Sequence, residues 1–169
     1  MAPRRILIAF LWMITLSAHS VAYDEQMLKS VVIYKLSLFV TWPDPPKNFL
    51  ICTFSDQQMV VFQKNIAHQK RKGALIQLKK VAVKEQNFSL CHILSFEGLP
   101  PEEAQNLLSS MQDKSILTIG HGDHFAKNGG MIGLFLKDGR VKFSINYTAS
   151  KKAGLSISAK VLPLATEVY

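Results

Sequence analysis

The sequence has only two cysteines in 169 residues, and it lacks the local motifs of the common enzyme classes. It contains no Gly-x-Ser-x-Gly elbow, no Walker lysine loop and no complete dinucleotide-binding glycine fingerprint. Its 12 acidic residues are scattered, so no pair of carboxylates marks a general acid and a general base. These absences give nucleotide binding and hydrolysis little support, and we expect no catalytic residues, no cofactor and no metal.

A transmembrane helix needs about 20 consecutive apolar residues, and the sequence has no apolar run of that length. The apolar segment at residues 6–16 is shorter and follows a pair of arginines. Small side chains then lead to Ala22, which is the pattern of a signal peptide, residues 1–22, cleaved after that residue. We expect residues 23–169 to be exported into an oxidising compartment and not to be embedded in a membrane.

Acidic residues are few relative to the 20 lysines and arginines, so the formal net charge is +8. Loss of the two arginines of the signal peptide lowers this charge to +6. The densest basic stretch, residues 70–72 with residues 79–80, predicts a solvated hairpin or loop face. Export argues against a nucleic-acid partner, whereas an acidic protein face and an anionic membrane surface both stay open as partners.

The two cysteines, Cys52 and Cys91, each lie in an apolar segment that is typical of a buried strand. An even pair in an exported protein favours a disulfide over free thiols. In the chain-entropy model, a bridge that closes a loop of about 40 residues stabilises a fold by about 4 kcal/mol. We predict a Cys52–Cys91 disulfide.

Hydrophobic periodicity and turn residues predict alternating helices and strands along the mature chain. An Asp-Gly pair between two apolar runs predicts a hairpin, and Pro163 argues against a central strand at the C-terminus. We expect an α/β protein with a single domain, residues 23–169, whose mixed β-sheet of about five to six strands is flanked by helices and ends in a hairpin. The expected helices cover residues 26–41, 57–67, 100–111 and 147–153, and the expected strands cover residues 49–54, 74–83, 91–96, 115–119, 131–136, 140–145 and 155–161, with a helix at 161–168 as the alternative for the last segment.

A glycine-rich loop at residues 120–130 contains His121, Asp123 and His124, which offer nitrogen and oxygen atoms to a ligand. Their spacing matches no recognised metal site. The alternative is an exposed turn in which Asp123 caps a short helical segment at residues 125–127.

Four segments of the sequence resemble the YfiR family: YKLSLFVTWP at 34–43, GGMIG at 129–133, DGRVKFSIN at 138–146 and AGLSISAKVL at 153–162. The resemblance covers essentially the whole mature chain. It implies a periplasmic, non-enzymatic regulator that binds the periplasmic sensor region of an inner-membrane diguanylate cyclase and holds it inactive. Release of the cyclase would raise cyclic-di-GMP and favour biofilm formation. The resemblance also implies a homodimer and disulfides that support the fold.

Two departures from the family pattern limit what can be carried over. A second cysteine pair near the C-terminal hairpin is missing, which puts a redox switch through a second bridge in doubt. His121 replaces the more usual aspartate after the glycine of the loop, so a ligand role for this loop cannot be transferred.

We place the contact with the cyclase, as a hypothesis, on residues 147–162 and the adjoining glycine-rich loop, because terminal elements and loops commonly carry binding. The competing interpretation is core packing, which is favoured for Ile145, Leu155 and Ile157. The candidate partner-binding residues are Tyr147, Lys151, Lys152, Leu155 and Lys160.

Two other functions stay open. A periplasmic module that binds a small ligand or a cell-wall fragment would need a convergent pocket, and a metal-dependent hydrolase would need bound metal. The candidate ligand-binding residues are Tyr34, Trp42, His121, Asp123 and His124. For the two aromatic residues, Tyr34 and Trp42, the alternative role is packing in the core or at a helix end.

Overall fold

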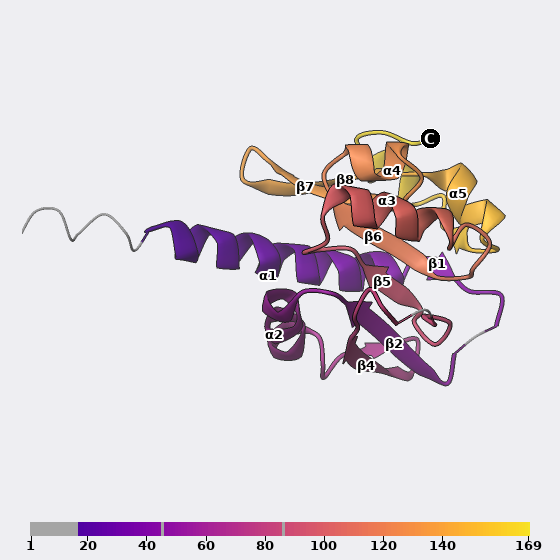
Figure 1. Ribbon diagram of the computed structural model, residues 1–169, viewed down its shortest axis with the longest axis horizontal. Coiled ribbons are helices and arrows are strands. Elements are labelled where there is room, and N and C mark those ends of the chain that lie inside the picture. Colours follow the sequence, from indigo (N-terminus) through magenta and orange to yellow (C-terminus); the bar gives the residue numbers. More distant parts are fainter. Residues whose placement is uncertain (1–16, 45, 86) are drawn as a thin grey trace, which may run out of the picture.

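The computed structural model describes residues 17–44, 46–85 and 87–169 (Figure 1). Most of the expected signal peptide therefore lies outside the described residues. Helix α1 (Ser17–Ser37) runs through the expected cleavage point after Ala22, and that cleavage stays a prediction. None of the described helices has the length and apolar character needed to cross a membrane.

A seven-stranded mixed sheet forms the centre of the fold, in the order β3-β4-β2-β5-β6-β7-β8. The five inner strands run parallel, and the two outer strands are antiparallel to their neighbours. The expected mixed α/β fold is confirmed, with more strands than the five to six predicted. The strands of this sheet are β2 (Asn48–Thr53), β3 (Lys70–Arg71), β4 (Ala74–Lys80), β5 (Ile93–Ser95), β6 (Leu117–His121), β7 (Ile132–Lys137) and β8 (Arg140–Ile145).

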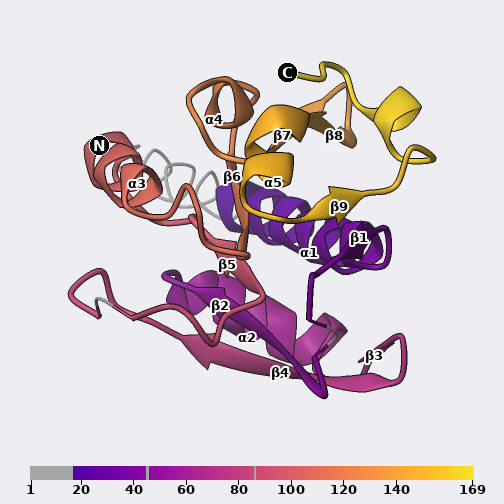
Figure 2. The same cartoon turned by 90° about the vertical axis from the view of Figure 1, so that its right-hand side faces the viewer.

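Five helices flank the sheet, and Figure 2 shows that the sheet curls with α1 on its inner side and α3 on its outer side. Successive residues of a strand point to opposite faces. Ile51 and Ile93 accordingly join the core under α1, whereas Cys52 and Leu94 join the core under α3. Besides α1, the helices are α2 (Asp56–Asn65), α3 (Pro101–Ser109), α4 (His124–Lys127) and α5 (Tyr147–Lys152).

The predicted disulfide is present between Cys52 of β2 and Cys91, which precedes β5. The Cα atoms of the two residues are 5.8 Å apart, and both side chains are buried on the α3 side of the sheet. The bridge therefore links β2 to the residues that lead into its parallel neighbour β5, within the core on the α3 side.

Local sequence signals account for several element boundaries. Ser55 caps α2, because its Oγ accepts a hydrogen bond from the backbone N–H of Gln58 at 3.2 Å. The hairpin between β7 and β8 turns at Asp138 and Gly139, whose φ angles are +52° and +69°. Asn146 caps α5 by accepting from the backbone N–H of Ala149 at 2.8 Å.

The C-terminal segment differs from the expectation. The predicted strand at 155–161 shrinks to β9 (Ser156–Ile157), which pairs with β1 (Val40–Thr41) in a separate two-stranded sheet. A 3₁₀ turn, Leu162–Leu164, follows in place of a helix at 161–168. Pro163 within this turn has no N–H to donate, so the strand cannot continue there.

The basic stretch at residues 70–72 also differs from the expectation, because Arg71 is not solvated. Its side chain is 4% exposed, and its guanidinium lies 4.5 Å from the ring centre of Trp42 and 4.6 Å from that of Phe49. Nε donates to the carbonyl of Ser37 at 3.0 Å, and Nη2 donates to the carbonyl of Val40. A planar, delocalised cation can stack on rings and donate in its own plane at once.

We predict that Arg71→Lys lowers the free energy of unfolding by about 2–3 kcal/mol, because an ammonium cannot keep both carbonyl contacts and the ring stacking. Urea unfolding of the purified protein with its disulfide intact measures this change. The matched control is Arg140→Lys, since Arg140 is exposed and its replacement should stay within about 0.5 kcal/mol. Equal effects of the two substitutions would contradict a structural role for Arg71.

Candidate functional site

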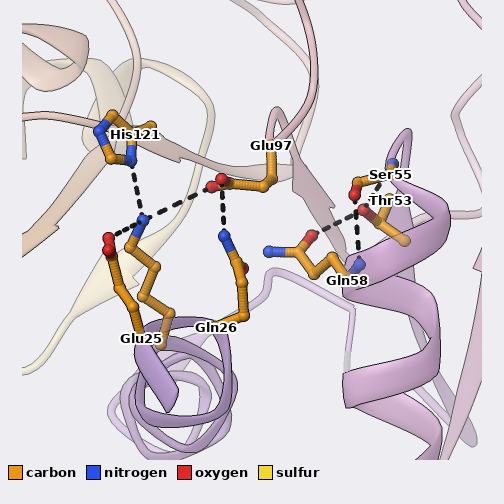
Figure 3. Close-up of polar contacts among 8 residues, drawn as sticks. Glu25, Gln26, Thr53, Ser55, Gln58, Glu97 and His121 are labelled. Atoms are coloured by element: carbon orange, nitrogen blue, oxygen red, sulfur yellow. Dashed lines mark hydrogen bonds and ion pairs between the residues drawn. The ribbon is translucent and has the colours of Figure 1, made fainter. Parts of the chain in front are cut away.

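A buried lysine organises the polar groups at the carboxyl ends of the central strands (Figure 3). Lys29 of α1 is 1% exposed, and its Nζ lies 2.8 Å from Oε1 of Glu25 and 3.8 Å from Oε2 of Glu97. The same Nζ lies 2.8 Å from Nδ1 of His121. Glu97 follows β5 and His121 ends β6, so this cluster ties α1 to the ends of two neighbouring parallel strands.

The contact with Lys29 fixes the protonation pattern of the neutral His121 ring. An ammonium group has donors only, so Nδ1 of His121 must accept and the ring proton then resides on Nε2. No partner of Nε2 occurs in the part of the chain that the structure describes, and the side chain of His121 is exposed. His121 therefore presents a free N–H donor at the end of β6.

Gln26 completes the cluster on the side of Glu97. Its Nε2 donates to Oε1 of Glu97 at 2.8 Å, while its own Oε1 is buried and lacks a partner among the described residues. At the end of β2, Thr53 donates to Oε1 of Gln58 at 2.6 Å in a second buried contact (Figure 3). Polar side chains thus gather at the carboxyl ends of β2, β5 and β6, the edge where open α/β sheets commonly bind ligands.

A cavity of about 310 Å³ lies beside this cluster, between α3 and α4 and beyond the ends of β5 and β6. Its volume is at the lower end of the range for small-molecule sites. Most of its walls are apolar. The lining residues are Phe96, Gly98, Leu99, Pro101, Ala104, Gln105, Leu108, His121, His124, Phe125 and Asn128.

The ring of Phe125 packs directly against two glycines of the loop. A Cβ atom at Gly120 would lie 2.2 Å from this ring, and one at Gly130 would lie 2.1 Å from it. The ring centre of Phe125 is 5.3 Å from that of Phe96 at an interplanar angle of 57°. Two of the glycines in residues 120–130 are therefore explained by sterics, because any side chain at these positions would collide with the Phe125 ring.

The predicted histidines of this loop come together at the cavity, whereas the predicted aspartate has another role. His121 and His124 both line the cavity. Asp123 caps α4, and its Oδ1 accepts from the backbone N–H of His124 at 2.8 Å, as the capping alternative predicts. Within the described residues, no group of three or more histidine, cysteine, aspartate or glutamate side chains is arranged to hold a metal ion.

The aromatic candidates lie elsewhere and do not converge with the loop. Trp42 is 4% exposed, and its ring centre is 5.1 Å from that of Phe49 and 6.3 Å from that of His92. His92 precedes β5, so this cluster lies at the opposite end of the parallel strands from His121. Tyr34 donates its hydroxyl to the carbonyl of Lys70 at 3.1 Å. Core and helix-end packing describes both aromatic residues.

The surroundings of His92 lower the pKa of its imidazole. Burial lowers the pKa of His92, and the nearby Arg71 guanidinium lowers it further. The backbone N–H of Leu50 donates to Nδ1 of His92 at 3.1 Å. The neutral imidazole is therefore the form that fits the folded protein.

The candidate partner-binding residues occupy α5 and the segment after it. Lys151, Lys152 and Lys160 are exposed, and Nζ of Lys151 lies 4.8 Å from the ring centre of Tyr147. Leu155 is 2% exposed and belongs to the core, which is the role that the core-packing interpretation gives it. The accessible part of this surface is therefore basic, with one tyrosine.

The chain is therefore an open α/β domain with a cavity at the carboxyl ends of its parallel strands. The chain belongs to the YfiR/HmsC-like family, whose model matches residues 26–166. Members of this family are periplasmic regulatory proteins without catalytic activity. No curated protein sequence matches the chain.

Two solved structures share the fold. One is the ABC domain from Streptococcus pneumoniae in complex with L-Trp, with 12% identity and a TM-score of 0.55 over 86% of this chain and 62% of that one. The other is a conserved domain protein from Vibrio cholerae O1 biovar El Tor, with 13% identity and a TM-score of 0.53 over 85% of this chain and 60% of that one. The chain thus spans about three fifths of the length of these structures, and at this identity the likeness shows the fold alone.

Lys29 itself, Glu25, Gln26 and Glu97 were not among the sequence-based candidates, whereas their neighbour His121 was. The only local signal for them is the spacing of Glu25 and Lys29, four residues apart on a helix, where opposite charges commonly pair. Glu97 and His121 reach the cluster from distant parts of the chain. Local patterns do not reveal such contacts.

We predict that stability falls as the pH drops from about 7 to about 5 and that His92→Gln reduces this fall. The unfolded imidazole takes up a proton near its ordinary pKa of 6.5, whereas folded His92 resists protonation, so the unfolded state binds more protons in this window. Urea unfolding at a series of pH values measures the slope. The exposed His68 supplies the control, since His68→Gln should leave the slope unchanged; an unchanged slope in both variants would contradict the prediction.

Proposed function

We propose that this protein is a periplasmic regulator that binds the periplasmic region of an inner-membrane diguanylate cyclase and holds the cyclase inactive. The observation that carries the proposal is the family match over residues 26–166. The Cys52–Cys91 disulfide is consistent with an oxidising compartment. Regulation of this kind lowers cyclic-di-GMP and restrains biofilm formation, and the proposal includes a homodimer of the regulator.

Inhibition in this proposal needs binding and no chemistry. A partner that prefers the inactive conformation of the cyclase shifts the population of the cyclase by the difference between its affinities for the two states. A difference of about 100-fold in affinity corresponds to about 2.7 kcal/mol, which one well-packed surface can supply.

The proposed contact surface is the basic face formed by Tyr147, Lys151, Lys152 and Lys160. Three exposed lysines on a short helix and the following segment offer positive charge to an acidic partner. Lys151 stacks over Tyr147, which orders both side chains before binding. Lys152 is held through a hydrogen bond from Nζ to Oε1 of Gln112 at 3.1 Å. Preordered side chains lose less conformational entropy on binding.

We predict that the full chain, expressed and purified from the periplasm, captures the periplasmic region of a diguanylate cyclase from the same cell. Combined Lys151→Glu, Lys152→Glu and Lys160→Glu substitutions should weaken this capture about tenfold or more, because like charges would then face each other across the interface. Biolayer interferometry at two salt concentrations measures the affinity and its electrostatic share.

The matched control carries the same charge change on other exposed positions: Lys47→Glu, Lys84→Glu and Lys137→Glu. We expect this variant to bind nearly as well as the wild type. Equal loss in the two variants would show that only net charge matters and would remove the basic face from the proposal. Capture of no cyclase region by the wild-type protein would overturn the proposed function itself.

A second candidate function is a periplasmic module that binds a small ligand or a cell-wall fragment. The cavity of about 310 Å³ at the carboxyl ends of the parallel strands favours it. The similar ABC domain was solved in complex with L-Trp, which supports a ligand-binding role for this candidate.

We predict that a thermal-shift screen of the periplasmic protein against cell-wall fragments and aromatic metabolites finds compounds that raise the unfolding midpoint. A ligand at 100 times its Kd stabilises the folded state by about 2.7 kcal/mol, which corresponds to about 5–11 °C for a domain of this size. A screen in which no compound of either class shifts the midpoint would contradict the second candidate and would leave cyclase binding untouched.

A further inference from the structure

We propose that the cavity between α3 and α4 binds a small aromatic carboxylic acid, with its ring among the apolar walls and its carboxylate at Nε2 of His121. This inference names the ligand class for the second proposed function and rests on that function. It is independent of cyclase capture, so the two can fail separately.

The apolar part of the cavity has the shape and chemistry to hold an aromatic ring. Phe96 and Phe125 form one side with tilted rings, and Leu99 and Leu108 add aliphatic surface. Aromatic rings favour offset and edge-on contacts with one another, and a ligand ring can add to an existing tilted pair in this way. A volume of about 310 Å³ suits one or two fused rings with a short substituent.

Phe125 is positioned for this role by its surroundings. Its ring occupies the space that Cβ atoms at Gly120 and Gly130 would take, and the backbone N–H of Gly130 donates to the Phe125 carbonyl at 3.0 Å. The backbone on both sides of α4 therefore packs against the ring. A preformed wall of this kind reduces the entropy lost when a ligand binds.

The polar end of the cavity favours an acidic group over an amine. No carboxylate lines the cavity, and its titratable lining side chains are the two histidines. Lys29 fixes His121 as a donor through Nε2, and the exposed imidazole of His124 lies on the same rim. The amide of Gln105 already donates to the carbonyl of Asn128 at 3.1 Å. A charge-assisted hydrogen bond from His121 to a ligand carboxylate is therefore the strongest polar contact on offer.

Isothermal titration of the periplasmic protein with indole-3-acetate and 4-hydroxybenzoate tests the inference. We expect saturable binding of at least one acid at a single site, and binding of the matching neutral amide, indole-3-acetamide or 4-hydroxybenzamide, about tenfold weaker or less. His121→Ala should weaken binding of the acid by a similar factor and should bring the acid and the amide to nearly equal affinity. His68→Ala, at an exposed histidine away from the cavity, should change nothing.

Two cavity-filling variants locate the site. Leu99→Trp and Ala104→Phe both add side-chain volume inside the cavity, and each should abolish binding while the variant still captures the cyclase region. The second variant keeps the test decisive if the first fails to fold. Binding that survives in a folded cavity-filled variant, amide binding as tight as acid binding, or no binding of either acid at millimolar concentration would overturn the inference.

Discussion

The buried guanidinium of Arg71 is the interaction on which the arrangement of the inner side of the sheet depends. The end of a helix leaves backbone carbonyls without intrahelical partners, and a cation there is stabilised by the helix dipole. Arg71 satisfies the carbonyls of Ser37, at the end of α1, and of Val40, in β1. One side chain from the edge of the sheet thereby fixes where α1 stops and where the chain turns. Because Val40 pairs with Ile157, the position of the C-terminal segment follows from the same contact.

The rings around Arg71 make this arrangement possible and also limit it. Trp42 and Phe49 cover the guanidinium and keep water away from its hydrogen bonds. Burial lowers the pKa of Arg71, yet arginine starts so far above neutrality that it stays charged. The pKa of His92, whose ring stacks on Phe49 at 5.0 Å, is lowered by its own burial and by the charge of Arg71. A second positive charge cannot be added to this core without cost, which is why the histidine is held neutral.

The sequence revealed those parts of the fold that depend on neighbours along the chain. The turn at Asp138 and Gly139 was predicted from its Asp-Gly pair, and the cap at Ser55 is an equally local interaction. The strands β1 and β3 have two residues each, so no periodicity can mark them. Arg71 sits between two lysines, and the composition of this run indicates solvent exposure even though the fold buries its middle residue.

The candidate site was only half visible from the sequence, for a related reason. The loop with His121 and His124 stood out because of its glycines and its titratable side chains. The cavity beside it depends on α3 and on the loop after β5, which are brought there by parallel pairing of strands far apart in the chain. The sequence does not predict the burial of Lys29, because a lysine on an amphipathic helix is ordinarily solvated. Its burial depends on contacts with Glu97 and His121, which are distant from it in the chain.

Hydrogen bonds connect one wall of the cavity to the start of the helix that carries the proposed partner surface. The amide of Asn146, which caps α5, donates to the carbonyl of Ala126 in α4 at 2.9 Å. Ser144 donates to the carbonyl of Asp123 at 3.0 Å. The α4 segment that forms one wall of the cavity is thus bonded to the start of the helix that carries the basic face. Where the partner of α5 also distinguishes two positions of α4, a ligand that binds those positions differently changes the partner's affinity, by no more than that difference in binding free energy.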